Sequence, residues 1–280
     1  MSRQWPKITV VTPSFNQAAY LQETIESVLN QDYPNLEYIV LDGGSTDGSI
    51  DILKKYEKYF AYWRTHPDDG QSAAIIEGFQ KSTGDILCWL NSDDFLAPGA
   101  LSLVGEYFQE HSEAEFLVGE VCIVNDKGER RHYLSEPKWD TNWQVYVRNC
   151  VPQPSTFWRR SLYMKIEGVN PTYQFGMDYD LWFQFLQHTK PHFIRRLLSY
   201  QRLHPLAKTA TLQDVEAVEK PIIAEKYFPT MAPVSKERNF IWRLHRILVK
   251  LIYGSYFRGA FMIIWLKFKQ DGRVKTISVP

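Results

Sequence analysis

Residues 85–94 read Asp-Ile-Leu-Cys-Trp-Leu-Asn-Ser-Asp-Asp, an apolar run that ends in polar side chains. The apolar part is typical of a strand that is covered on both faces of a parallel sheet. In open α/β sheets ligands bind at the carboxyl ends of such strands, and Mg²⁺ or Mn²⁺ there takes few carboxylates together with phosphate oxygens and water. Asp93 and Asp94 are therefore candidate metal ligands. The alternative is that Ser92 or Asp93 caps a helix that begins after Pro98.

The residues before this run alternate between strand and helix patterns. Apolar runs predict strands at residues 7–13, 36–41, 60–64 and 85–90, and helical spacing predicts helices at 20–31, 50–59 and 71–82. This order predicts an α/β fold with a Rossmann-like, mostly parallel sheet that carries helices on both faces. Right-handed crossovers then bring the carboxyl ends of the strands to one edge.

The pattern changes after residue 101. Two strand patterns, at 116–124 and 130–134, flank Asp126-Lys-Gly128, which predicts a β-hairpin. Mixed elements follow, with a strand predicted at 153–158, a helix at 180–188 and an extended stretch at 192–203.

Composition excludes some classes of partner. The 280 residues carry 32 basic and 32 acidic side chains, so net charge gives no reason to expect nucleic acid as a partner. The three cysteines lack metal-site spacing, and residues 1–6 show no apolar core of a signal peptide. We therefore expect a globular protein of a reducing, cytoplasmic compartment.

Two further strand ends carry polar signals. In Thr12-Pro-Ser-Phe-Asn16 a rigid proline and an aromatic ring could pack on a base or ribose, although Pro13 alone would end a strand. In Asp42-Gly-Gly-Ser-Thr-Asp47 the first carboxylate could accept a hydrogen bond from a base N–H, and the glycines let a ligand approach the backbone. The alternative there is an Asx turn with a helix cap at Asp47 or Ser49. The Lys-Ser/Thr pair of a P-loop is missing.

Five short segments, in this order, resemble one family. They are Thr12-Pro-Ser-Phe-Asn16, Leu41-Asp-Gly-Gly-Ser-Thr-Asp-Gly48, Pro67-Asp-Asp-Gly-Gln71, Thr83-Gly-Asp85 and Asn91-Ser-Asp-Asp94. Together they resemble the bacterial family 2 glycosyltransferases of GT-A fold over roughly residues 7–210, above all those that assemble O-antigen, capsule or other cell-surface polysaccharide. The resemblance implies an inverting transfer of a sugar from a nucleoside diphosphate sugar to an acceptor hydroxyl.

The resemblance also implies roles for single residues. Those matching Pro13, Asp42 and Asp68 frame the nucleotide, and those matching Asp93 and His204 hold a divalent cation, Mn²⁺ or Mg²⁺. A lone histidine is otherwise more often structural. Further contacts to the nucleotide-sugar are expected from Thr12, Phe15, Asn16, Asn91 and Ser92. The catalytic domain is expected at residues 1–232, with a nucleotide-binding half at about 7–110 and an acceptor-binding half at about 111–232.

Two positions depart from the family pattern. Asn91 stands where the family's Asp-any-Asp motif begins, which keeps an oxygen for the ribose but loses a charge. Metal affinity is expected to be weaker unless Asp94 compensates. Met177-Asp178 stands where the family often has Glu-Asp, so only the second carboxylate is present.

The segment Gly176-Met-Asp-Tyr-Asp180 is predicted to open a helix, whose dipole keeps a carboxylate ionised. Asp178 is therefore predicted to be the general base that takes the acceptor proton. The alternative is that Asp178 or Asp180 is the N-cap. Arg202 and Lys208 are predicted to neutralise the leaving diphosphate, with an exposed surface charge as the alternative.

Residues 233–280 form a basic region of different character. No Asp or Glu occurs from Arg238 to Gln270, and Arg243, Arg246 and Lys250 recur at helical spacing opposite apolar residues. This predicts an amphipathic helix on a membrane surface. The apolar run at residues 259–266 is far shorter than the roughly 20 residues of a spanning helix. The alternative is a helical pair packed on the catalytic domain or on a second subunit, as in a homodimer.

These patterns favour a metal-dependent inverting glycosyltransferase, peripheral at the cytoplasmic face of the inner membrane, with a glycan or polyprenol-linked acceptor. One alternative is a sugar nucleotidyltransferase, which should carry a Gly-rich basic loop where this chain has Thr12-Pro-Ser-Phe-Asn-Gln17. Another is a non-catalytic, membrane-associated protein that binds nucleotides or glycans.

Overall fold

The computed structural model describes residues 4–134, 151–229, 244, 247 and 248. Its first half contains β1 (Ile8–Ser14), α1 (Ala18–Leu29), β2 (Leu36–Asp42), α2 (Ser49–Tyr56), η1 (Glu57–Tyr59), β3 (Tyr62–Thr65), α3 (Gln71–Lys81), β4 (Ile86–Trp89), β5 (Phe95–Leu96) and α4 (Ala100–Glu110). Its second half contains β6 (Phe116–Val124), β7 (Arg130–Leu134), η2 (Gln153–Ser155), β8 (Thr156–Arg159), α6 (Arg160–Tyr163), α7 (Met177–Leu186), β9 (His192–Arg202), α8 (Lys208–Thr211) and α9 (Gln213–Tyr227).

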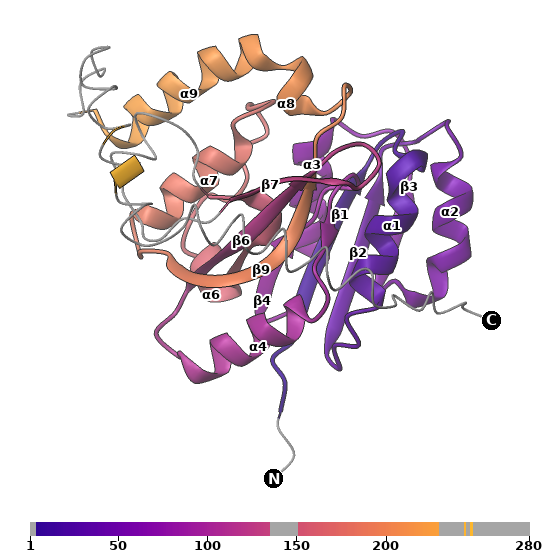
Figure 1. Cartoon of the computed structure of the whole chain (residues 1–280), viewed down its shortest axis with the longest axis horizontal. Helices are drawn as coiled ribbons and strands as arrows, with labels where there is room; N and C mark the ends of the chain where they lie inside the picture. Colours follow the sequence, from indigo (N-terminus) through magenta and orange to yellow (C-terminus); the bar gives the residue numbers. More distant parts are fainter. Residues whose placement is uncertain (1–3, 135–150, 230–243, 245–246, 249–280) are drawn as a thin grey trace.

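The strands within the described residues belong to one curled sheet in the order β3-β2-β1-β4-β8-β6-β9-β5, with β7 paired to β6 (Figure 1). The strands β1 to β4 pair in parallel, and β8 runs antiparallel between β4 and β6. Because β8 is antiparallel to both β4 and β6, strand β6 runs in the same direction as β1 to β4. Strand β9 is parallel to β6 and shares that direction. The predicted α/β fold with a mostly parallel sheet is therefore confirmed.

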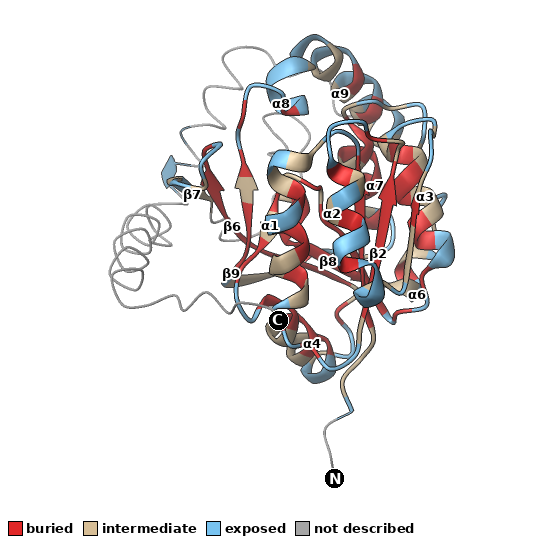
Figure 2. Ribbon diagram, turned by 90° about the vertical axis from the view of Figure 1, so that its right-hand side faces the viewer, coloured by how far each residue is buried: buried red, intermediate tan, exposed pale blue. Residues whose placement is uncertain are grey.

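Helices cover both faces of this sheet. Helices α1 and α2 lie against each other on one face, with their polar sides outward, while the strands behind them are buried (Figure 2). On the other face Phe79 of α3 and Trp182 of α7 pack on Trp89 of β4, with ring centroids 6.3 and 5.9 Å away. These three aromatic residues thus belong to the core.

Several boundaries differ from the sequence predictions. Helix α4 begins with Gly99 as N-cap, so neither Ser92 nor Asp93 caps it. Helix α7 begins at Met177 with Gly176 as N-cap and no side-chain cap, so the N-cap alternative for Asp178 and Asp180 is wrong. The short strand β5 and the helices α8 and α9 were not predicted. Most of residues 233–280, predicted as a basic amphipathic region, lie outside the described residues.

The Thr83-Gly-Asp85 segment lies at the amino-terminal edge of the sheet, where it binds the buried Glu37 of β2. Thr83 donates its N–H and its hydroxyl to the Glu37 carboxylate at 2.6 Å each, and Thr9 and Lys7 add further contacts. Burial raises the pKa of Glu37, but these hydrogen bonds outweigh it and lower that pKa to about 2. This segment is therefore structural.

Candidate active site

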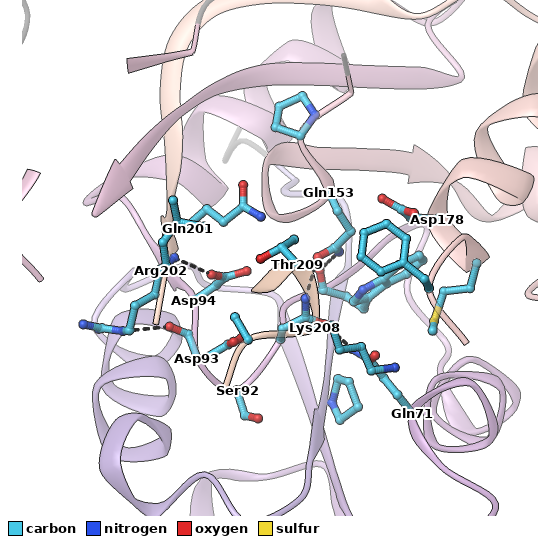
Figure 3. Close-up of a pocket in the computed structure, with 18 of the residues that line it drawn as sticks. Gln71, Ser92, Asp93, Asp94, Gln153, Asp178, Gln201, Arg202, Lys208 and Thr209 are labelled. Carbon is cyan, nitrogen blue, oxygen red and sulfur yellow. Dashed lines mark hydrogen bonds between the residues drawn. The ribbon is translucent and has the colours of Figure 1, made fainter. Parts of the chain in front are cut away.

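A pocket of about 830 Å³ opens at the carboxyl-terminal edge of the sheet, between the ends of β1, β2, β4 and β9 and the helices α7 to α9. Ten of the candidate site residues from the sequence line it: Pro13, Phe15, Asp68, Asn91, Ser92, Asp93, Asp94, Asp178, Arg202 and Lys208. Figure 3 shows Asp93 and Asp94 on one side, Asp178 on the other and Lys208 between them. Thr12, Asn16, Asp42 and His204 do not line the pocket.

The predicted metal ligands Asp93 and His204 are in contact. Nε2 of the buried His204 lies 3.1 Å from Oδ2 of Asp93, and its ring packs on Tyr20 of α1. Two ligands at right angles, each about 2.1 Å from a cation, are about 3 Å apart, so this pair fits two adjacent positions of an octahedral ion. Within the described residues no group of three or more His, Cys, Asp or Glu side chains surrounds a common point. A carboxylate and an imidazole are donors that Mn²⁺ or Mg²⁺ can accept beside other oxygen ligands.

Asp94 and Arg202 hold the turn that carries Asp93 in place through hydrogen bonds. The Asp94 carboxylate is buried and accepts the backbone N–H of Arg202 at 2.8 Å. Burial, and then the charge of Asp93, raise the pKa of Asp94 well above its usual value. The buried Arg202 guanidinium donates to the carbonyl of Asp93 at 3.0 Å and pairs with Glu23, pointing away from the pocket centre (Figure 3). This geometry favours a positioning role for Arg202 over the predicted contact with diphosphate.

Asn91 belongs to an oriented chain of amides. Gln153 donates to the carbonyl of Trp89 at 2.8 Å, which fixes its oxygen toward the Asn91 amide nitrogen at 3.2 Å. The Asn91 oxygen in turn accepts a hydrogen bond from Gln71 at 2.8 Å. One lone pair of the oxygen predicted for the ribose is thus already used.

Asp42, predicted to contact a base, differs from the prediction. That carboxylate is fully buried and accepts hydrogen bonds from the N–H groups of Gly44 and Ser45 and from the hydroxyls of Ser45 and Thr65. This is the Asx-turn alternative, and it leaves no exposed oxygen for a base. Asp68 does line the pocket.

Phe15 and Gly43 complete a slot beside Asp68. The Phe15 ring is 60% exposed, and a Cβ at Gly43 would lie 3.3 Å from that ring and 3.2 Å from Oδ1 of Asp68. A group bound in this part of the pocket would meet an exposed aromatic residue and a carboxylate oxygen. Thr12, by contrast, is buried with its hydroxyl 3.2 Å from that of Tyr38, and the Asn16 side chain accepts the N–H of Thr46.

Asp178 and Asp180 face different surroundings, as their spacing on a helix requires. Asp178 lines the pocket in the first turn of α7. Asp180 is fully buried and accepts hydrogen bonds from Gln184 at 2.7 Å and Tyr227 at 3.0 Å. Asp180 therefore joins α7 to α9 and does not face the pocket.

Lys208, which like Arg202 was predicted from the sequence to neutralise the diphosphate, lines the pocket. Its ammonium donates to the carbonyl of Gln174 at 2.9 Å. Burial lowers the pKa of Lys208, while the charges of Glu219 and Asp178 act in the opposite direction. Although much of the residue is exposed, its charged end lies among protein atoms near Asp178.

Gln71, which ends the Pro67–Gln71 segment, and Gln153 also line the pocket. Four further pocket residues had no signal in the sequence: Gln201, Thr209, Glu216 and Lys220. Lys220 pairs with Glu216 on α9, and its ammonium lies 6.0 Å from the ring centroid of Phe175. The positions of Thr209, Glu216 and Lys220 follow from the packing of α8 and α9 beside the pocket.

Comparison with known proteins identifies the family. The sequence profile described as "Glycosyl transferase family 2" matches residues 9–182, which is more than half of the chain. The chain belongs to glycosyltransferase family 2. The matched region includes Asp68, Asp93 and Asp178 but ends before His204 and Lys208.

Relatives extend the similarity. An uncharacterized glycosyltransferase of Mycobacterium tuberculosis is 31% identical over 198 residues, which cover 69% of this chain and 74% of the relative. One of Rickettsia typhi is 25% identical over 226 residues, 76% of this chain and 70% of the relative. The putative teichuronic acid biosynthesis glycosyltransferase TuaG of Bacillus subtilis is 31% identical over 143 residues, covering 49% of this chain and 56% of TuaG.

Solved structures support the fold. The crystal structure of S. aureus TarS 1-349 in complex with UDP-GlcNAc superposes with a TM-score of 0.58 at 19% identity, covering 71% of this chain and 59% of that one. This likeness agrees with the predicted GT-A type of α/β fold. None of the helices in the part of the chain that the structure describes has the length and apolar character needed to span a membrane.

Proposed function

We propose that this family 2 glycosyltransferase transfers a sugar from a nucleoside diphosphate sugar to a hydroxyl of a glycan or lipid-linked glycan, with inversion, in the synthesis of surface polysaccharide. One observation carries the proposal: Asp93 and Asp178 face each other across a single pocket, with Lys208 between them. The named roles of TuaG in teichuronic acid biosynthesis and of UDP-GlcNAc as the ligand of TarS are consistent with it.

Asp93 and His204 would hold the divalent cation, Mn²⁺ or Mg²⁺. When bound, such an ion neutralises charge on a diphosphate and makes it a better leaving group. Asp94, Arg202 and Thr24 fix the turn that carries Asp93, because Thr24 donates its hydroxyl to the carbonyls of Ser92 and Asp94 at 2.9 and 2.7 Å. The Lys208 ammonium would add positive charge on the diphosphate side.

Asp178 would act as the general base on the acceptor side. The amino-terminal turn of α7 stabilises an ionised carboxylate, which can take the proton of the attacking hydroxyl. Phe15, Gly43 and Asp68 would receive the nucleoside. The basic region at residues 233–280 would keep the enzyme at the inner face of the cell membrane, near a lipid-linked acceptor.

The experiment that tests this function measures the melting temperature with UDP, GDP, dTDP and CMP, each with and without Mn²⁺. A ligand that binds only the native state raises the melting temperature. The nucleotide that gives the largest shift then identifies the donor class, and release of sugar from the matching nucleotide-sugars tests turnover. A protein that shifts with none of the four nucleotides in the presence of Mn²⁺ contradicts the proposal. Binding without turnover on any sugar or acceptor favours the non-catalytic alternative.

A further inference from the structure

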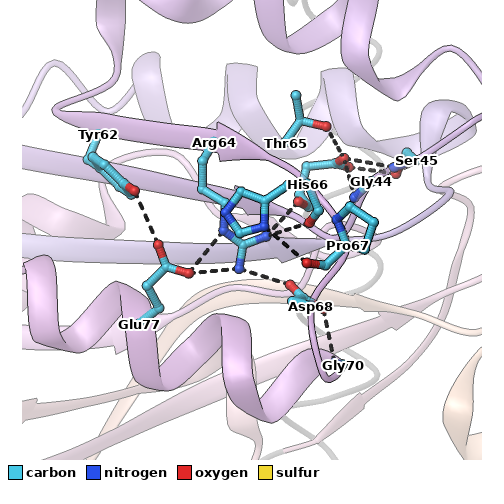
Figure 4. Close-up of polar contacts among 11 residues, drawn as sticks. Gly44, Ser45, Tyr62, Arg64, Thr65, His66, Pro67, Asp68, Gly70 and Glu77 are labelled. Atoms are coloured by element: carbon cyan, nitrogen blue, oxygen red, sulfur yellow. Dashed lines mark hydrogen bonds and ion pairs between the residues drawn. The ribbon is translucent and has the colours of Figure 1, made fainter.

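The buried Arg64 of β3 contacts three of the segments beside the pocket end that Phe15, Gly43 and Asp68 line. One of its terminal nitrogens, Nη1, donates to the carbonyl of Asp42 at 2.6 Å and to that of His66 at 3.2 Å. The other, Nη2, lies 2.9 Å from Oδ2 of Asp68, and Nε and Nη2 both donate to Oε2 of Glu77 at 3.0 and 2.9 Å (Figure 4). One side chain thus joins the end of β2, the loop after β3 and helix α3.

The contact with Asp68 determines which carboxylate oxygen faces the slot. Oδ2 of Asp68 is buried, and its one partner among the described residues is Nη2 of Arg64, with which it forms an ion pair. Oδ1 accepts the N–H of Gly70 at 2.9 Å and lies on the side of Gly43, next to the exposed ring of Phe15. Because Arg64 engages one oxygen, the other is directed toward a ligand in the slot.

Glu77 fixes the guanidinium in turn. It accepts two hydrogen bonds from Arg64 and one from the hydroxyl of Tyr62 at 3.2 Å. Burial lowers the pKa of Arg64, but Glu77 and then Asp68 outweigh it, so the guanidinium stays charged. Two carboxylates around one buried cation leave this cluster with a net negative charge, which favours a ligand edge that donates an N–H.

We propose that Arg64 is a positioning residue for the nucleobase: it acts through Asp68, whose Oδ1 accepts an N–H of the base of the donor nucleotide. This inference rests on the proposed nucleotide-sugar function and adds to it the device that orients Asp68. A planar guanidinium reaches four acceptors at once, whereas a lysine ammonium has no such fork. Arg64→Lys therefore keeps the positive charge but cannot make the simultaneous contacts with Asp42, Asp68 and Glu77.

The test measures binding by calorimetry, with Mn²⁺ present, for whichever of UDP, GDP and dTDP the wild-type protein binds best, and for pyrophosphate. Because Asp68 would lose its orientation, Arg64→Lys should weaken nucleoside diphosphate binding at least about tenfold, the order of a lost charge-assisted hydrogen bond. Pyrophosphate lacks a base, so its affinity should change less than about twofold. Asp68→Asn should weaken the nucleotide similarly, and the double variant should be no weaker than the weaker single variant.

Arg159→Lys is the matched control. The guanidinium of Arg159 also donates hydrogen bonds to backbone carbonyls, those of Phe108, His111 and Ala114, but Arg159 does not line the pocket. It should lower the melting temperature and leave both affinities unchanged. If Arg64→Lys does not fold, Glu77→Gln, which loosens the guanidinium, is the second variant and should weaken the nucleotide selectively by about threefold.

The outcomes are separable. Wild-type nucleotide affinity in Arg64→Lys or, failing that variant, in Glu77→Gln overturns the inference while the proposed function stands. The inference is also overturned if Arg64→Lys lowers the affinities for nucleotide and pyrophosphate equally. It is overturned as well if the effects of the Arg64 and Asp68 substitutions on nucleotide affinity are additive. A wild-type protein that binds pyrophosphate but no nucleotide overturns the proposed function together with this inference.

Discussion

Asp178 and Asp180 stand two positions apart on α7, about 200° of rotation around a helix, and have different surroundings. Asp178→Asn should lower transfer by about 10²- to 10⁴-fold, because the general base is lost, while nucleotide affinity and melting temperature stay near wild type. Asp180→Asn should instead lower the free energy of unfolding by about 1–3 kcal/mol, since its buried oxygens bind Gln184 and Tyr227. Turnover and melting of both variants check this. A dead Asp180→Asn beside an active Asp178→Asn would reverse the assignment.

Asp93 supplies the second prediction for a single residue. Nucleoside diphosphate binding should require Mn²⁺ or Mg²⁺, and Asp93→Ala should abolish both the requirement and most of the affinity, because His204 alone holds no hard cation. Calorimetry with Mn²⁺ and with EDTA measures this directly. The comparison variant is Asp85→Ala at the opposite edge of the sheet, which should bind like wild type. If the wild-type protein bound the nucleoside diphosphate equally well with Mn²⁺ and with EDTA, the predicted metal role would be wrong.

The sequence was informative for residues whose role depends on their place at the end of a strand or the start of a helix. Asp93 follows an apolar strand, and Asp178 opens a helix, so the sequence alone was enough to predict that both face the pocket. Asp42 follows a strand as well, yet neighbouring donors satisfy its carboxylate, and a sequence cannot count those donors. Arg64 carried no signal, because its partners are brought together only by the packing of β3 against α3.

At the scale of elements, the amino-terminal edge of the sheet gives a prediction of stability against pH. The folded-state pKa of Glu37, lowered to about 2 from 4.5, means that its contribution is fully present above about pH 4.5 and is lost as the pH falls toward 2. Glu37→Gln should cost about 2 kcal/mol at pH 7, because hydrogen bonds from Thr83 and Thr9 lose their charged acceptor.

Urea unfolding of Glu37→Gln and wild type at pH 7 and pH 3 checks this prediction. The difference between the two proteins should shrink at pH 3. Glu57→Gln, an exposed substitution on η1, is the control and should change stability by less than about 0.5 kcal/mol at either pH. A Glu37→Gln difference that is the same at both pH values would contradict the role of the ionised carboxylate.

Elements with a strong pattern were predictable, and those set by packing were not. Apolar runs located β1, β2 and β4, whose residues are almost all buried. Helix α9 has little apolar periodicity and contains Pro221, so its pattern is weak, and it is held by contacts such as Glu219 with the N–H groups of Phe175 and Gly176. Strand β5 has two residues, too few for any periodicity.

At the scale of the whole molecule, the basic region after residue 232 predicts a location. Deleting residues 238–280 should move the protein from the membrane to the soluble fraction while hydrolysis of the donor stays measurable, because the pocket is built from earlier residues. Flotation with liposomes that contain anionic lipids measures the change. Unchanged flotation would contradict the membrane role, and an unfolded truncation would favour packing on the catalytic domain or a second subunit.

The strand order has a consequence for how the chain folds as it leaves the ribosome. Strands β1 to β4 can pair as soon as they are made. In the described sheet β8 covers the free edge of β4 and pairs with β6 on its other side, and β9 pairs with β6 later still. Until residues 156–202 emerge, a nascent chain presents two open sheet edges beside an aromatic core. A product that stops between residues 134 and 156 would therefore be prone to aggregate, and chaperone binding should be strongest during synthesis of that interval.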